Sequence, residues 1–205
     1  ALVWAGGSDA DTQVVVYEAA PGPMAARLWW MLQWAGHPKV AVLDGGWTSW
    51  VRSGLPVRSG PESLAPKRFK PREVPGACVT TAQVQEISGD PKYVLLDARS
   101  GPRFRGEVEP IDPVAGHIPG AFSAPCEENV TPEGRFHPPD VLRRRFEKFM
   151  KSVPPENVIC YCGSGVTAAH NILAIAHAGL GRVRLYAGSW SEWITNAARP
   201  IAKDA

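Results

Sequence analysis

Residues 158–170 read VICYCGSGVTAAH and carry a complete strand–loop–helix pattern. The apolar run Val158–Tyr161 predicts a buried strand, and the alanine-rich stretch 168–178 has the periodicity of a helix. The two glycines between them allow a tight loop, because glycine adopts backbone conformations that other residues avoid. The sequence therefore places Cys162 where a buried strand ends and a helix is about to begin.

The same pattern occurs a second time, nearer to the start of the chain. Residues 40–50, VAVLDGGWTSW, match residues 183–193, VRLYAGSWSEW, at an offset of 143. Residues 14–18, VVVYE, match residues 158–162, VICYC, at an offset of 144, so one loop differs in length by a residue. Strands that alternate with helices predict an α/β fold of three layers, α/β/α, with a mainly parallel sheet.

The front half of a unit is present only in the second copy. It comprises an expected helix over 80–87, a strand over 93–96, the turn GHIPGA at 116–121 and a basic amphipathic helix over 140–150. The first unit has no counterpart to these segments. The sequence thus predicts two homologous units, of which the first is incomplete.

These patterns divide the chain into three parts. We expect residues 1–57 to form the back half of an inactive domain and residues 80–205 to form the catalytic domain. The segment 58–79 between them is rich in Pro, Gly, Lys and Arg and predicts a linker. The chain opens without Met and within a pattern, which is compatible with a removed N-terminal leader.

The composition excludes several classes of partner. Hydrophobic residues make up 44% of the 205, and the net charge is only +2, too balanced to predict nucleic-acid binding. No apolar run approaches the roughly 18 residues of a membrane span, so we expect no membrane partner. The four cysteines form no CxxC pair and the five histidines are scattered, which predicts no metal site. Reduced cysteines favour the cytoplasm.

The loop after Cys162 has the properties of an anion site. Its glycines let successive main-chain N–H groups turn inward, and the helix that follows adds positive potential at its N-terminus. Both effects favour an ionised sulfur suited to covalent catalysis. A buried core position is the alternative interpretation, and it fits Cys160, inside the strand, better. The first unit has Glu18 in the equivalent place, so packing does not require the thiol.

At this point the motifs can be compared with a known family. CGSGVTAAH at 162–170 resembles the active loop of tandem rhodanese-type sulfurtransferases, especially the 3-mercaptopyruvate sulfurtransferase branch. LLDAR, GHIPGA, YAGSWSEW and LDGGWTSW are similar to further signatures of that family, in the right order. The resemblance implies an active second domain and an inactive first one. It also implies no cofactor, a small anionic donor (thiosulfate or 3-mercaptopyruvate), and a thiol or cyanide as acceptor.

The resemblance also assigns roles to individual residues. Cys162 would be the nucleophile that becomes a persulfide, and Arg103 would bind the donor anion through its guanidinium. A solvated surface charge is the alternative for Arg103. The outer sulfur would be held by main-chain N–H groups of the loop, with two hydroxyls available. These loop residues are Gly163, Ser164, Gly165, Val166 and Thr167.

Two further positions concern the donor pocket. Trp190 follows a glycine–serine turn, so it is a candidate pocket wall. Mercaptopyruvate enzymes commonly carry a second arginine after the Glu-Pro of the Arg103 loop, and here Ile111 stands in its place. This difference makes thiosulfate at least as good a candidate donor.

Two other functions remain open on the sequence. A cysteine-dependent phosphatase uses a similar loop, but such loops usually end in an arginine and are one residue longer, whereas residues 162–169 contain none. A persulfide carrier or regulatory module that docks to a partner protein would have the same intact loop. Transfer to a protein thiol, compared with turnover on cyanide, separates the carrier from the enzyme.

Overall fold

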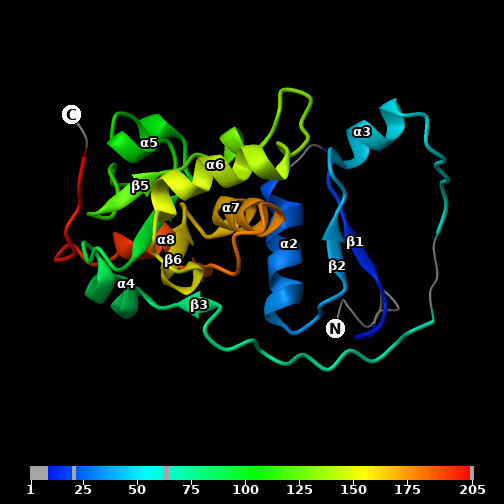
Figure 1. The fold of residues 1–205 in the computed structure, drawn as a ribbon, viewed down its shortest axis with the longest axis horizontal. Helices are drawn as coiled ribbons and strands as arrows, with labels where there is room; N and C mark the ends of the chain where they lie inside the picture. The colour runs from blue at the N-terminus through cyan, green and yellow to red at the C-terminus, as the bar shows by residue number, and fades with distance from the viewer. Residues whose placement is uncertain (1–8, 20–21, 62–64, 204–205) are drawn as a thin grey trace.

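The strands form two parallel sheets (Figure 1). The computed structural model describes residues 9–19, 22–61 and 65–203. The smaller sheet pairs β1 (Val14–Val16) with β2 (Val40–Val42). The larger has the order β3-β7-β6-β4-β5. Its strands are β3 (Cys78–Val79), β4 (Val94–Asp97), β5 (Ala121–Ser123), β6 (Val158–Tyr161) and β7 (Arg184–Tyr186).

Helices cover both faces of the larger sheet, because neighbouring residues on each strand point to opposite sides. Leu96, Cys160 and Leu185 belong to one buried cluster, and Leu95 and Ile159 to the other. The helices are α2 (Pro23–Trp34), α3 (Gly46–Arg52), α4 (Thr81–Ile87), α5 (Gly101–Arg105), α6 (Pro139–Met150), α7 (Val166–His177) and α8 (Ser189–Trp193). Residues of α6 and α7 lie in the first cluster and residues of α4 and α8 in the second, which confirms the α/β/α layering.

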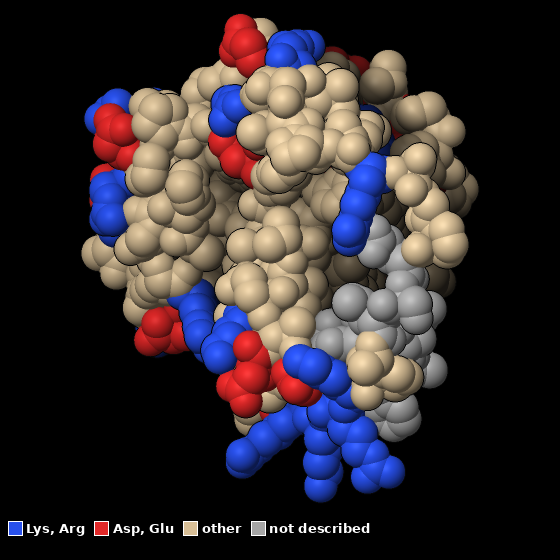
Figure 2. Space-filling view, turned by 90° about the vertical axis from the view of Figure 1, so that its right-hand side faces the viewer, with Lys and Arg blue, Asp and Glu red and all other residues tan. Residues whose placement is uncertain are grey.

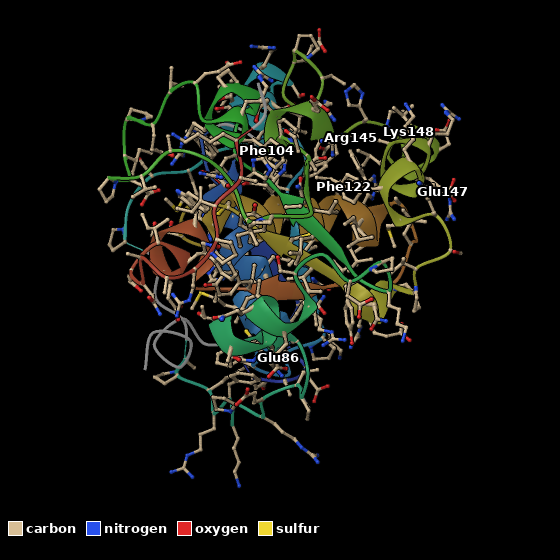
Figure 3. The ribbon with its side chains drawn as sticks, turned by 90° about the vertical axis from the view of Figure 1, so that its left-hand side faces the viewer. Glu86, Phe104, Phe122, Arg145, Glu147 and Lys148 are labelled. Atoms are coloured by element: carbon tan, nitrogen blue, oxygen red, sulfur yellow. The ribbon has the colours of Figure 1, made fainter. Side chains whose placement is uncertain are left out.

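The amphipathic pattern of the 140–150 segment is confirmed in α6. Its buried residues are Leu142, Phe146 and Met150, which recur at the spacing of one helix face. Figure 3 shows Glu147 and Lys148 at the outer edge of this helix, with Arg145 nearer to the sheet. The helix therefore uses its apolar stripe to cover the sheet.

Helix α2 joins the two sheets. It packs against α7 and against β1 and β2, so the equivalent helices of the two repeats lie side by side (Figure 1). Small residues such as Ala25, Ala26 and Ala168 are buried and let the helices approach closely. Arg27 of α2 donates from Nη1 to the carbonyl oxygen of Gly165 at 3.3 Å. The first unit therefore touches the loop that follows Cys162.

The segment expected as a linker runs along the surface but is fixed at several points. Arg72 N donates to the Ala35 carbonyl at 2.8 Å, and Phe69 is buried against the ring of His37. Its exposed basic residues match the blue side chains gathered at the foot of Figure 2. The last residues of this segment form β3, which pairs with β7. Within the described ranges, no helix is long and apolar enough to cross a membrane.

Short helices are the main elements that the sequence does not predict. Helices α3, α5 and α8 have seven, five and five residues, too few for a periodic pattern to stand out. Helix α3 begins at Gly46 and α8 at Ser189, which are equivalent positions of the repeat. Both helices follow a strand through a tight turn and begin the segment that carries the tryptophans.

A buried ion pair fixes the carboxyl end of β4. Arg99 Nη2 lies 2.6 Å from Asp97 Oδ2, and Arg99 Nη1 lies 3.3 Å from Glu109 Oε2. The exposed fractions of these side chains are 1%, 0% and 4%. Burial disfavours the charged guanidinium, but the hydrogen bonds and charge of Asp97 outweigh it and raise the pKa of Arg99. Asp97 therefore holds the Arg99 guanidinium in its charged form.

Replacing Arg99 by Met should lower the free energy of unfolding by about 3–5 kcal/mol, because the buried Asp97 carboxylate loses its partner and Glu109 loses one of two. The matched control is Arg144→Met, which breaks an exposed pair with Asp140 on α6 and should cost less than about 1 kcal/mol. Urea unfolding of both variants measures the difference. Equal losses would contradict a structural role for the buried pair.

Candidate active site

Cys162 lies at the carboxyl end of β6, a strand with neighbours on both sides. The preceding carbonyl, that of Tyr161, accepts a hydrogen bond from Ala98 N at 2.8 Å. Helix α7 begins four residues later, at Val166, after Gly165 in the left-handed region with φ of 76°. A Cβ atom at Gly165 would lie 2.7 Å from the carbonyl oxygen of Ala187. Only glycine fits at position 165, because a side chain would clash there and because the backbone conformation is one that glycine adopts readily.

The loop presents a set of unpaired donors. In the part of the chain that the structure describes, the main-chain N–H groups of residues 163–167 donate no hydrogen bond to a protein atom. They stand at the N-terminus of α7, where unpaired N–H groups and the helix dipole favour negative charge. Ser164 is exposed and Thr167 is half-buried, so two hydroxyls lie on the same loop.

The first unit shows what such a helix end binds in this fold. Glu18, the equivalent of Cys162, accepts a hydrogen bond from Ala25 N at 2.7 Å through Oε1. Ala25 lies in the first turn of α2, the equivalent of α7. In the repeat that lacks the cysteine, a carboxylate therefore occupies the helix N-terminus.

A second loop holds the main chain of Cys162 from both sides. Cys162 N donates to Ser189 Oγ at 3.1 Å, and Ser189 Oγ donates to the Tyr186 carbonyl at 2.8 Å. Trp190 N donates to the Cys162 carbonyl at 2.9 Å. Ser189 has φ of 55°, unusual for a residue other than glycine. The left-handed turn is what aims its hydroxyl at Cys162.

Trp190 contacts the cysteine loop through its main chain. The residue is fully buried, its Nε1 donates to the Val114 carbonyl at 2.8 Å, and the Arg99 guanidinium lies 4.8 Å from the ring centre. The Trp190 side chain thus lies in the buried cluster on the α4 side of the sheet, and its main chain is what contacts Cys162. Its role as a pocket wall stays a prediction.

Cys162 belongs to both the loop and the core. The residue is only 2% exposed and packs with the buried cluster on the α7 side of the sheet. On the sequence, a loop position and a core position are alternatives for Cys162, and the structure combines them. Cys162 is therefore a nearly closed-off core residue that also begins the loop.

The other three cysteines are held as neutral thiols. Burial raises the pKa of Cys160, and it raises that of Cys78 as well. Burial, with the charges of Glu127 and Cys162, raises the pKa of Cys126 to about 12. All four cysteines are free. Only Cys162 stands ahead of unpaired main-chain donors.

Arg103 lies beside the start of the cysteine loop. A Cβ atom at Gly163 would be 3.7 Å from Arg103 Nη2. The guanidinium is bound by two carboxylates: Nη2 lies 2.7 Å from Glu109 Oε1 and 3.2 Å from Asp112 Oδ2. Its side chain is 15% exposed. Arg103 is thus close to Cys162, and a solvated surface position is excluded.

Asp112 and Ser191 are neighbours of the loop that the sequence does not single out. Ser191 Oγ donates to Asp112 Oδ1 at 2.7 Å, and Ser191 N donates to the Gly163 carbonyl at 3.0 Å. The contact between the Ser191 N–H and the Gly163 carbonyl recurs at the equivalent place in the first unit. In the first unit Thr48, the equivalent of Ser191, donates from its N–H to Ala19 at 3.1 Å.

The side chains of two further residues are exposed. The side chain of Ile111 is 75% exposed. It stands where mercaptopyruvate enzymes commonly carry an arginine. Arg105 forms an ion pair with Glu107 and is 41% exposed. Among the residues described, no group of three or more His, Cys, Asp or Glu side chains is arranged to hold a metal ion.

Comparison with known proteins defines the class. The family model of the rhodanese-like domain matches residues 2–53 and 80–196. The solved structure of an anaerobic ergothioneine biosynthesis enzyme from Chlorobium limicola superposes with a TM-score of 0.85 at 25% identity. The superposition covers 99% of this chain and 54% of the Chlorobium limicola enzyme. By sequence and by fold, the chain belongs to the rhodanese family.

Curated relatives narrow the branch. A probable 3-mercaptopyruvate sulfurtransferase from Pseudomonas aeruginosa is 50% identical over 94% of this chain and 68% of its own length. The human 3-mercaptopyruvate sulfurtransferase is 36% identical over 93% of this chain and 65% of its own length. A putative thiosulfate sulfurtransferase from Mycobacterium tuberculosis is 36% identical over 94% of this chain and 68% of its own length. The chain thus spans about two thirds of the relatives that it matches.

Alkylation by iodoacetamide at pH 7.5 should modify Cys162 before any other cysteine. The raised pKa values of Cys78, Cys126 and Cys160 leave almost no thiolate at that pH, and only the thiolate reacts. Labelling of Cys126 should begin to compete only as the pH approaches about 12. Peptide mass mapping over time measures the order. First labelling at Cys126 or Cys78 would indicate that Cys162 is sealed from solvent.

Proposed function

We propose that this chain transfers sulfane sulfur through a persulfide on Cys162. The observation that carries the proposal is the row of unpaired N–H groups at residues 163–167, directly after Cys162 and ahead of α7. Such donors stabilise negative charge on a sulfur bound to Cys162. The carboxylate of Glu18 at the equivalent helix end supports the same preference for an anion.

The reaction has two halves. In the first, the Cys162 thiolate attacks the outer sulfur of the donor and forms a new S–S bond. With thiosulfate, the old S–S bond breaks and sulfite leaves with its electron pair. With 3-mercaptopyruvate, the C–S bond breaks and the carbon takes a proton to give pyruvate. In the second half, a thiol or cyanide attacks the outer sulfur and releases the Cys162 thiolate.

Both donors are retained in this proposal. Relatives of this chain are named for 3-mercaptopyruvate and for thiosulfate. Arg103 beside Gly163 supplies a cation for either anion, and Ile111 supplies none. We also propose a reducing compartment such as the cytoplasm, because the chain keeps four free cysteines.

Replacing Cys162 by Ser should abolish sulfur loading, because the hydroxyl is not a nucleophile toward sulfane sulfur under these conditions. The protein is incubated separately with thiosulfate and with 3-mercaptopyruvate, and intact mass is read for one added sulfur atom. Cys126→Ser is the matched control and should load like the parent chain. A Cys162→Ser variant that still gains the sulfur would overturn the assignment.

Replacing Arg103 by Ala should raise KM for the anionic donor by about tenfold. The reason is that the donor loses one charge-assisted hydrogen bond, which contributes roughly 1.5 kcal/mol. Arg105→Ala, on the same helix but paired with Glu107 at the surface, is the control. Steady-state kinetics with cyanide as acceptor measures both. An unchanged KM in Arg103→Ala would remove this side chain from the donor site.

A further inference from the structure

One carboxylate is tied to the cysteine loop through Ser191. Ser191 Oγ donates to Asp112 Oδ1 at 2.7 Å while Ser191 N donates to the Gly163 carbonyl at 3.0 Å. A Cβ atom at Gly163 would lie 3.8 Å from Asp112 Oδ2. The Asp112 side chain is only 7% exposed. A negative charge is thus held against the residue that follows the nucleophile.

Nearby arginines neutralise the charge of this cluster only in part. Arg99 pairs with Asp97 and Glu109, and Arg103 pairs with Glu109 and Asp112. The cluster has three carboxylates and two guanidiniums, so one negative charge is in excess. Its side chains are at most 15% exposed, so salt screens it weakly. Burial opposes the charge of Glu109, but the hydrogen bond from Arg103 keeps its pKa below the ordinary value.

We propose that Asp112 determines specificity by favouring sulfur donors with a single negative charge over dianions. The inference rests on the proposed role of Cys162 as the residue that accepts sulfur. The loop amides and the end of α7 attract an anion in proportion to its charge, and Asp112 adds a repulsion that grows in the same proportion. Asp112 thus reduces the advantage that a dianion would otherwise have over a monoanion. A dianion therefore meets twice the repulsion that a monoanion meets.

Two sulfur donors that react with Cys162 in the same way differ in their net charge. Methanethiosulfonate carries one negative charge and thiosulfate carries two. In both, the Cys162 thiolate bonds to the outer sulfur and the S–S bond breaks. Its electron pair leaves with methanesulfinate in one case and with sulfite in the other. The persulfide product is the same, no oxidant or reductant is needed, and the ratio of the two loading rates reports mainly on donor charge.

The first experiment measures the rate of sulfur loading on Cys162 by intact mass with each probe. Asp112→Asn should raise the ratio of thiosulfate to methanethiosulfonate rates about threefold or more, because one repulsive charge is removed. Asp112→Ala removes the same charge and should shift the ratio in the same direction. Asp112→Glu restores the charge and should return the ratio toward that of the parent chain. Asp140→Asn, an exposed aspartate on α6, is the control and should not change it.

The second experiment does not depend on sulfur transfer. Iodoacetate and iodoacetamide are similar in size and differ by one negative charge, and both alkylate cysteine thiolates. Asp112→Asn should raise the rate at Cys162 for iodoacetate relative to iodoacetamide. If this ratio shifts but neither probe loads sulfur on the parent chain, the proposed function fails and charge selection at Cys162 stands. If neither ratio shifts in Asp112→Asn or Asp112→Ala, the role of Asp112 is overturned.

Discussion

The site depends on a row of main-chain N–H groups that have no partner among the residues that the structure describes. Unpaired donors at a helix N-terminus are costly to bury and favourable to an anion, so they determine what the neighbouring side chain must be. The two repeats meet this constraint in different ways. In the first, the carboxylate of Glu18 satisfies the end of α2. In the second, Cys162 stands ahead of α7 and leaves the donors of residues 163–167 for a ligand.

The rest of the second unit holds this loop in place. Strand β6 lies between two neighbours, and Ser189 and Trp190 bind the main chain of Cys162 on both sides. Arg27 of the first unit adds a contact to the carbonyl of Gly165. These contacts hold the loop at its start and at Gly165, beside a cysteine that is only 2% exposed.

Local patterns explain how much of this arrangement the sequence predicts. The strand before Cys162, the helix after it and the repeat are all encoded in contiguous segments, and the structure confirms them. Asp112 and Ser191 are 79 positions apart along the chain. No local pattern indicates that they meet, or that Arg103 is shared by two carboxylates. The burial of Cys162 was missed for a similar reason, because it results from packing between α7 and the sheet.

The most direct test follows the loop amides while sulfur is loaded onto the protein. Proton–nitrogen NMR spectra recorded before and after incubation with methanethiosulfonate report the environment of each N–H group. The account predicts that the signals of residues 163–167 move when Cys162 gains a sulfur, while those of distant residues such as Gly89 and Gly134 stay in place. Loading of Cys162 without any change at residues 163–167 would contradict it.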